Sequence, residues 1–166
     1  TFYERSNGKE KVLNQITASH IDPDKALLMY DIVIAVDTNT INDTSVTAIA
    51  QMCFTGKTDG VVDVNCKVWD NTKILKPEVH AWAVVINTVY SQLQNKKQNK
   101  TVAIVVDSEL GALQQYNKRE KPLVQDIYLP PGFTLVYASA DTGMEFIANQ
   151  LIRICDKCAG EVLSCI

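Results

Sequence analysis

Two short apolar runs, each ended by an aspartate, constrain the fold of this chain more than any other feature. The runs are YDIVIAVD at 30–37 and TVAIVVD at 101–107. They carry almost no polar side chain before their last position, as expected of strands buried on both faces of a sheet. Strand ends in open α/β sheets are where ligand sites form. Asp37 and Asp107 are therefore candidate site residues.

A third acid, Glu78, opens the clearest helical pattern in the chain. Pro77 stands at a favoured first-turn position, and apolar residues then recur at helical spacing to about residue 95. Carboxylates that gather at one point repel one another, and a sheet tolerates them together mainly when a divalent cation neutralises them. The arrangement therefore predicts a site for a hard metal ion.

Each of the three acids also has a purely structural interpretation. Asp37 can form an Asx-type turn into TNT, Glu78 can interact with the positive end of a helix dipole, and Asp107 can cap the following helix. These interpretations stay open. The position of the three acids at the boundaries of three different elements nevertheless favours a shared acidic cluster.

Hydrophobic periodicity and turn residues predict the elements and their order. Strands are expected at 30–37, 45–55, 60–70, 101–107 and 133–138. Helices are expected at 77–95, 108–120 and about 142–157. The glycines of GKTDG indicate a hairpin between the second and third strands, so the first three strands form an antiparallel meander. The order is β-β-β-α-β-α-β-α, and right-handed crossovers place the last two strands parallel to the first.

The chain is expected to contain one α/β domain at 30–166, with a central mixed five-stranded sheet flanked by helices. A lead-in at 1–29 precedes it, in which KEKVLNQITASH predicts one helix and DPDK predicts a turn or a helix start. The chain does not begin with Met, so we expect it to belong to a longer chain or to a complex.

Composition narrows the classes of partner and the compartment. The formal net charge is −3, so any contact with nucleic acid needs a local basic patch rather than a basic molecule. No apolar run approaches the roughly 20 residues of a membrane helix, and no membrane partner is expected. Five cysteines, an odd number without secretory features, indicate reduced thiols and a cytoplasmic location.

Three segments together resemble the ribonuclease H-like superfamily, with the closest likeness to type 1 ribonuclease H. These segments are PEVHAWAVVINTV, VVDSELGALQQY and ADTGMEFIANQLIR, in this order after the strand that ends at Asp37. The resemblance covers about residues 30–158 and implies a ribonuclease H-like fold. It also implies hydrolysis of the RNA strand of an RNA–DNA hybrid, with Mg²⁺ or Mn²⁺ as the cofactor.

The resemblance assigns roles to particular residues. Asp37 would bridge two metal ions, Glu78 would complete one of them, and Asp107 with Asn149 or Asp141 would complete the other. The fourth acid of the family falls on Asn149, and the loop histidine of the family falls on Asp141. An amide can coordinate a cation but cannot act as a base. The alternative function is therefore a ribonuclease H-like module that has lost catalysis and serves binding or assembly.

Substrate contacts are expected from two other places. The resemblance assigns a nucleic-acid handle to the basic loop after the helix at 108–120, and further contacts are expected just after Asp37. The candidate substrate-binding residues are Thr38, Asn39, Lys118, Arg119 and Lys121. Solubilising loop charge is the competing interpretation of the three basic residues.

The remaining alternatives concern two tryptophans, a histidine and a second fold. Trp69 and Trp82 are expected to serve packing rather than base stacking, and His80 is expected on a different helix face from Glu78. The run IVIAVDTNT also faintly resembles the first metal motif of a von Willebrand type adhesion domain. That fold needs a helix after Asp37, where this sequence predicts strands.

Overall fold

The structure is a computed structural model that describes residues 2–6, 9–13, 23–53, 61–107, 110–140 and 146–166. A mixed five-stranded sheet forms its centre, in the strand order β6-β5-β4-β7-β8. The strands are β4 (Ile32–Ile41), β5 (Thr44–Cys53), β6 (Val61–Asp70), β7 (Val102–Val106) and β8 (Phe133–Tyr137). The first three are antiparallel neighbours, and β7 and β8 run parallel to β4, as predicted.

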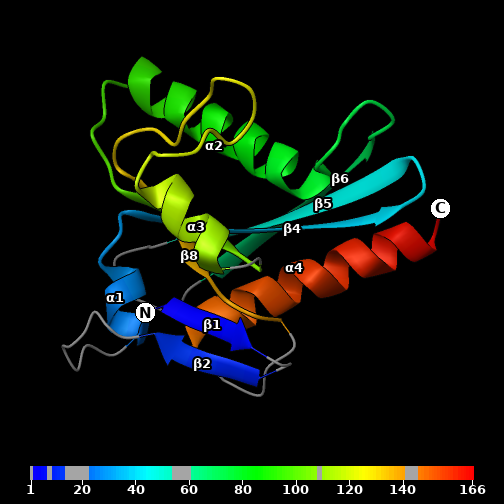
Figure 1. Ribbon diagram of the computed structural model, residues 1–166, viewed down its shortest axis with the longest axis horizontal. Coiled ribbons are helices and arrows are strands. Elements are labelled where there is room, and N and C mark those ends of the chain that lie inside the picture. Colours follow the sequence, from blue (N-terminus) through cyan, green and yellow to red (C-terminus); the bar gives the residue numbers. More distant parts are fainter. Residues whose placement is uncertain (1, 7–8, 14–22, 54–60, 108–109, 141–145) are drawn as a thin grey trace.

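Helices cover both faces of this sheet (Figure 1). They are α2 (Pro77–Asn95), α3 (Leu110–Asn117) and α4 (Ile147–Ser164). The sheet separates two hydrophobic cores, one on each face, because successive residues of β4 point to opposite faces. Ile34 and Val36 pack with α2 and α3, whereas Val33 and Ala35 pack with α4.

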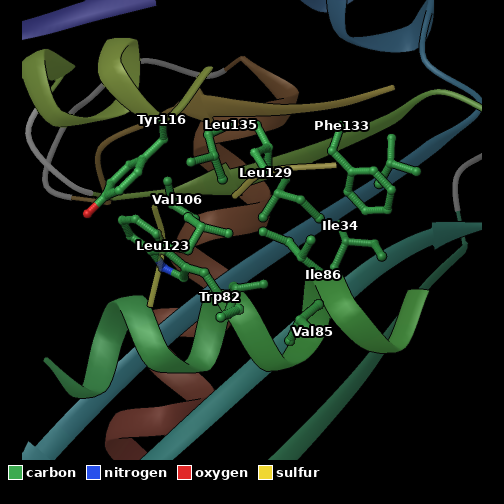
Figure 2. Packing of buried hydrophobic residues seen from close by; sticks show 14 of the residues in the cluster. Ile34, Trp82, Val85, Ile86, Val106, Tyr116, Leu123, Leu129, Phe133 and Leu135 are labelled. Carbon is green, nitrogen blue, oxygen red and sulfur yellow. The ribbon is translucent and has the colours of Figure 1, made fainter. Parts of the chain in front are cut away.

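The core under α2 and α3 is built around large side chains (Figure 2). Trp82 and Ile86 of α2 point at the sheet, and both are almost fully buried. The ring of Tyr116 from α3 meets the Trp82 ring edge-on at a centroid distance of 6.2 Å. This aromatic contact joins the two helices over one face of the sheet.

The first sheet strand does not end where it was predicted to end. The notion that Asp37 closes the strand and that TNTINDT forms a turn is wrong, because β4 continues to Ile41. The turn comes at Asn42 and Asp43, and Asn42 has a φ of 54°. Hydroxyl groups paired across β4 and β5 keep these polar residues in the sheet.

The helix predicted within the lead-in is also wrong over its first part. Residues 9–13 form β2 (Lys9–Leu13), which pairs antiparallel with β1 (Phe2–Ser6). The pairing sets Phe2 opposite Leu13 and Ser6 opposite Lys9 in register. The rest of the predicted helix lies at 14–22, outside the described residues. A short helix, α1 (Pro23–Leu28), follows where DPDK predicted one.

The helix boundaries differ from prediction mainly near the C-terminus. The limits of α2 agree with the prediction, and α3 ends early, at Asn117. The side chain of Asn117 there bonds both the N–H and the carbonyl of Leu135 in β8. The last helix, α4, runs on to Ser164 because its buried residues recur at helical spacing to the end. Its predicted start near 142 lies outside the described residues, and the division at residue 30 stays a prediction.

Candidate acidic site

The structure brings Asp37 to the side of the sheet that α4 covers. Its side chain is only 7% exposed. Because β7 ends at Val106, opposite Val36, β4 passes Asp37 without a neighbour on that side. Asp107, which follows β7, approaches Asp37 from this side.

Three further carboxyl groups approach Asp37, each from a different element. Asp156 comes from α4 and shares a side-chain hydrogen bond with it, while Glu78 comes from the first turn of α2 and Asp107 follows β7. Burial, then the charge and hydrogen bond of Asp156, and then the charges of Glu78 and Asp107 raise the pKa of Asp37 to about 7. The three acids predicted to form a cluster are thus neighbours in space.

Glu78 responds to the same surroundings. Burial, and next the charge of Asp107, raise the pKa of Glu78 to about 7. Asp107 does take part in local structure, since its Oδ2 accepts a hydrogen bond from the N–H of Ala140 at 3.2 Å. This bond ties the residue after β7 to the chain segment after β8, and it leaves Asp107 half-buried beside Glu78.

Asn149, on which the resemblance placed the fourth acid, contacts the chain segment after β8. It is fully buried in the first turn of α4, and its Nδ2 donates to the carbonyl of Ser139 at 3.0 Å. Its Oδ1 has no hydrogen-bond partner among the described residues. Asp141 lies outside the described residues, so its predicted role stays a prediction.

Asp156 is the acid that the sequence reasoning missed. Asp156 is an exposed residue of α4 that follows the buried Cys155, so the sequence pattern does not distinguish it from an ordinary solvent-facing carboxylate. Its place beside Asp37 is visible only in the folded structure.

The donor chemistry of this cluster suits a hard divalent cation, which prefers carboxylate oxygens. Asp37 Oδ2 is buried and has no hydrogen-bond partner among the described residues, so one ligand atom is available at the centre. The described His, Cys, Asp and Glu side chains nevertheless contain no group of three that converges on one metal position.

The predicted substrate-binding residues separate into two groups. Thr38 and Asn39 flank the acids: the Thr38 hydroxyl bonds that of Thr47 at 2.8 Å, and Asn39 Nδ2 donates to the carbonyl of Asp156 at 3.4 Å. Arg119 instead holds its own loop, donating to the carbonyls of Asn117 and Pro130.

The other two basic residues of that loop also differ from each other. The Lys121 ammonium lies 5.3 Å from the centre of the Tyr116 ring, whereas Lys118 is exposed. Arg119 and Lys121 thus have structural contacts in addition to any role in binding.

The two tryptophans differ as well. Trp82 is a core residue, as predicted, whereas Trp69 is half-buried on β6 with its ring 5.5 Å from that of His80.

The described cysteines Cys66, Cys155, Cys158 and Cys165 are free thiols. No helix of the described residues is long and apolar enough to cross a membrane.

Comparison with known proteins shows the fold but no family. No protein-family model matches the chain, and no curated protein matches its sequence. The fold is similar to the crystal structure of prototype foamy virus protease-reverse transcriptase in its native form, with a TM-score of 0.58 and 14% sequence identity. The match covers 91% of this chain and 22% of that one. With the mixed sheet and its flanking helices, this likeness confirms the predicted α/β, ribonuclease H-like fold class.

Proposed function

We propose that this domain binds Mg²⁺ or Mn²⁺ and hydrolyses phosphodiester bonds in nucleic acid, with the RNA strand of an RNA–DNA hybrid as its leading substrate. The observation that carries the proposal is the surroundings of Asp37. A buried carboxylate oxygen without a described partner lies beside carboxyl groups from three other elements. A protein that only needed a stable fold would gain by replacing such a group with an apolar one.

The residues proposed to hold the cations are Asp37, Glu78, Asp107 and Asp156. Asp156 joins them because its carboxyl group approaches Asp37, and Asn149 stays a candidate through its Oδ1, since only its Nδ2 is bonded to Ser139. Cations at this site supply a neutralising charge, an activated water and stabilisation of the leaving oxygen. Above about pH 7, Asp37 and Glu78 give up the protons that burial retains on them, and the site then presents carboxylates. Asp141 stays a candidate for proton transfer.

The likeness to a reverse transcriptase supports nucleic acid as the substrate class. The chain corresponds to 22% of that protein, so the activity of the whole enzyme is not carried over. Thr38 and Asn39 flank the acids and are proposed to contact the strand being cut, while exposed Lys118 is the basic residue best placed to meet a phosphate.

A cleavage assay combined with thermal unfolding tests the proposal. We expect Mg²⁺ or Mn²⁺ to raise the Tm of the wild-type protein and to support cutting of a labelled hybrid. Asp37→Asn and Asp156→Asn should each lose both effects. The matched control is Glu161→Gln, which removes an exposed acid from the same helix as Asp156 and should keep both. Cleavage that persists in Asp37→Asn would refute the proposed site.

A binding module without catalysis is the second candidate. It is favoured by one observation, that the described acids do not converge on a single metal position. In that case the protein would bind a hybrid without cutting it in either metal, and neither cation would change the Tm. The same assay therefore separates the two functions.

A further inference from the structure

A hollow beside the acidic site has the character of a binding pocket. It lies between α2 and the outer strands β5 and β6, and its volume is about 180 Å³. The lining residues are Thr47, Ile49, Lys67, Trp69, His80, Ala81, Val84 and Val85. We call this hollow the Trp69 pocket. It opens to solvent at its rim, where Lys67 is exposed and Val84 is 46% exposed.

The aromatic pair at the pocket is fixed in place. The indole N–H of Trp69 donates to the hydroxyl of Thr47 at 2.9 Å, so the polar edge of the ring already has its partner. The Thr47 hydroxyl in turn lies 2.8 Å from that of Thr38. His80 is tilted 38° from the Trp69 ring, at 5.5 Å between centroids. A rigid indole with a satisfied N–H offers an apolar surface to a flat ligand.

The pocket adjoins the acidic site through neighbours in the sequence. Thr38 follows Asp37 on β4, and His80 lies two residues after Glu78 on α2. The pocket faces the α2 side of the sheet and Asp37 faces the α4 side, but the hydroxyl of Thr38 bonds that of Thr47 in the pocket lining. The acids and the pocket are thus connected through successive residues of β4.

We propose that the Trp69 pocket holds one unpaired nucleobase of the nucleic acid strand at the acidic site. The proposal rests on the proposed function, since it takes the same strand as the ligand. An apolar pocket with an aromatic pair matches the flat face of a base, and Lys67 at the rim matches the charge of the adjoining phosphate. A base inside the pocket cannot stay paired with the opposite strand. The preferred substrate is therefore a hybrid with a bulged or overhanging nucleotide.

Binding measured without cleavage tests this inference. The host is the Asp37→Asn protein, and the probes are two labelled hybrids of one sequence: one is fully paired, and the other carries a single bulged 2-aminopurine. We expect tighter binding of the bulged hybrid, together with quenching of 2-aminopurine fluorescence as the base stacks. Adding Trp69→Ala should weaken binding of the bulged hybrid by about 5- to 150-fold and leave the paired hybrid little changed.

Three further variants separate the pocket from general damage to the fold. Trp69→Phe retains an aromatic face and should keep most of the preference, while Lys67→Ala changes an exposed residue and should reduce it. Val68→Ala is the matched control, because this exposed neighbour points to the opposite face of β6. Equal affinity for the two hybrids, or a preference that survives Trp69→Ala, would overturn the inference.

The outcomes for the pocket and for the nuclease are distinct. A base preference that depends on Trp69, in a protein that cuts nothing with Mn²⁺, supports the pocket and refutes the proposed catalysis. Cutting of a hybrid without any preference for the bulged base refutes the pocket alone. A wild-type protein that neither binds nor cuts either hybrid with Mn²⁺ refutes both.

Discussion

The carboxyl group of Asp37 is buried, and the carboxyl groups of Asp156, Glu78 and Asp107 lie near it. Burial disfavours its charged form, and the neighbouring charges add to that effect. The folded chain therefore retains protons at Asp37 and Glu78 that the unfolded chain releases at lower pH. At the scale of single residues, the acidic site costs stability near neutral pH.

This cost predicts how stability depends on pH without divalent cations. The ordinary pKa values of 3.8 for Asp37 and 4.5 for Glu78 rise to about 7 in the folded protein. Between about pH 4 and 7 the folded state binds more protons than the unfolded state, so stability should fall as pH rises through this window. We expect the Tm, measured in a chelator across this range, to decrease. A Tm that rises through the window would contradict the raised pKa values.

Asp37→Asn should remove much of that dependence. The amide is neutral at every pH and can still donate a hydrogen bond to Asp156. Because each unit of pKa shift corresponds to about 1.4 kcal/mol, the variant should gain on the order of 1–4 kcal/mol near pH 8. Denaturant unfolding at about pH 5 and pH 8 measures the gain. Loss of stability at the higher pH would mean that the Asp37 carboxylate is stabilised by groups outside the described residues.

Asn149→Asp tests where the fourth acid belongs. The new carboxylate would face the carbonyl of Ser139 in a fully buried position, with the donor removed. We expect a loss of about 2–5 kcal/mol near neutral pH and no gain in stabilisation by Mg²⁺. Asn87→Asp adds the same charge at an exposed position of α2 and should cost little. A cation-dependent rise in Tm for Asn149→Asp would place the fourth acid at residue 149, as the resemblance implied.

At the scale of elements, turns and helix contacts determine which substitutions the fold accepts. The turn before β8 needs Gly132 at a φ of 85°, where an added Cβ would lie 3.3 Å from the carbonyl oxygen of Lys100. Gly160 lies within α4, and its added Cβ would make an ordinary contact at 3.6 Å with Asn39. A Gly→Ala substitution is therefore strained at Gly132 and accommodated at Gly160.

We therefore expect Gly132→Ala and Gly160→Ala to shift stability in opposite directions. The first should cost about 1–2 kcal/mol because an L side chain resists the left-handed conformation. The second should gain up to about 1 kcal/mol because alanine is the better helix former. Urea unfolding of the pair gives both values. Equal effects would show that backbone conformation does not control these positions.

At the scale of the whole molecule, the central strands of the sheet are buried and the outer strand β6 is exposed. β4 and β7 contribute side chains to both cores, and the described side chains of β7 are fully buried. On the outer strand β6, residues 65–68 are exposed. The Trp69 pocket lies next to these exposed residues, between α2 and the strands β5 and β6.

Hydrogen exchange should follow this asymmetry. We expect the amides of β4 and β7 to exchange last, through global unfolding, and those of β6 to exchange earlier through local opening. Native-state exchange followed by mass spectrometry reports both. Protection of β6 equal to that of β7 would indicate that another chain or segment covers the outer strands.

Much of the fold was predictable because local patterns encode it. The apolar runs before Asp37 and Asp107 and the helical spacing after Pro77 determine the central strands and α2. The right-handed crossover rule then orders the strands and brings three acids to one region. The predictions failed where pairing partners decide the structure, as in β2, which is a strand through its backbone pairing with β1 and not the predicted helix.

The sequence by itself determined the order of the elements and the meeting of Asp37, Glu78 and Asp107, because periodicity is local and crossover handedness is general. Only the tertiary structure decided that β4 continues past Asp37, since this depends on hydroxyl pairs with β5. It also decided that Asp156 lies beside Asp37, because packing on the sheet sets which turn of α4 lies over β4. Contacts between residues far apart in the chain, such as Trp69 and His80 across β6 and α2, exist only once the layers have packed.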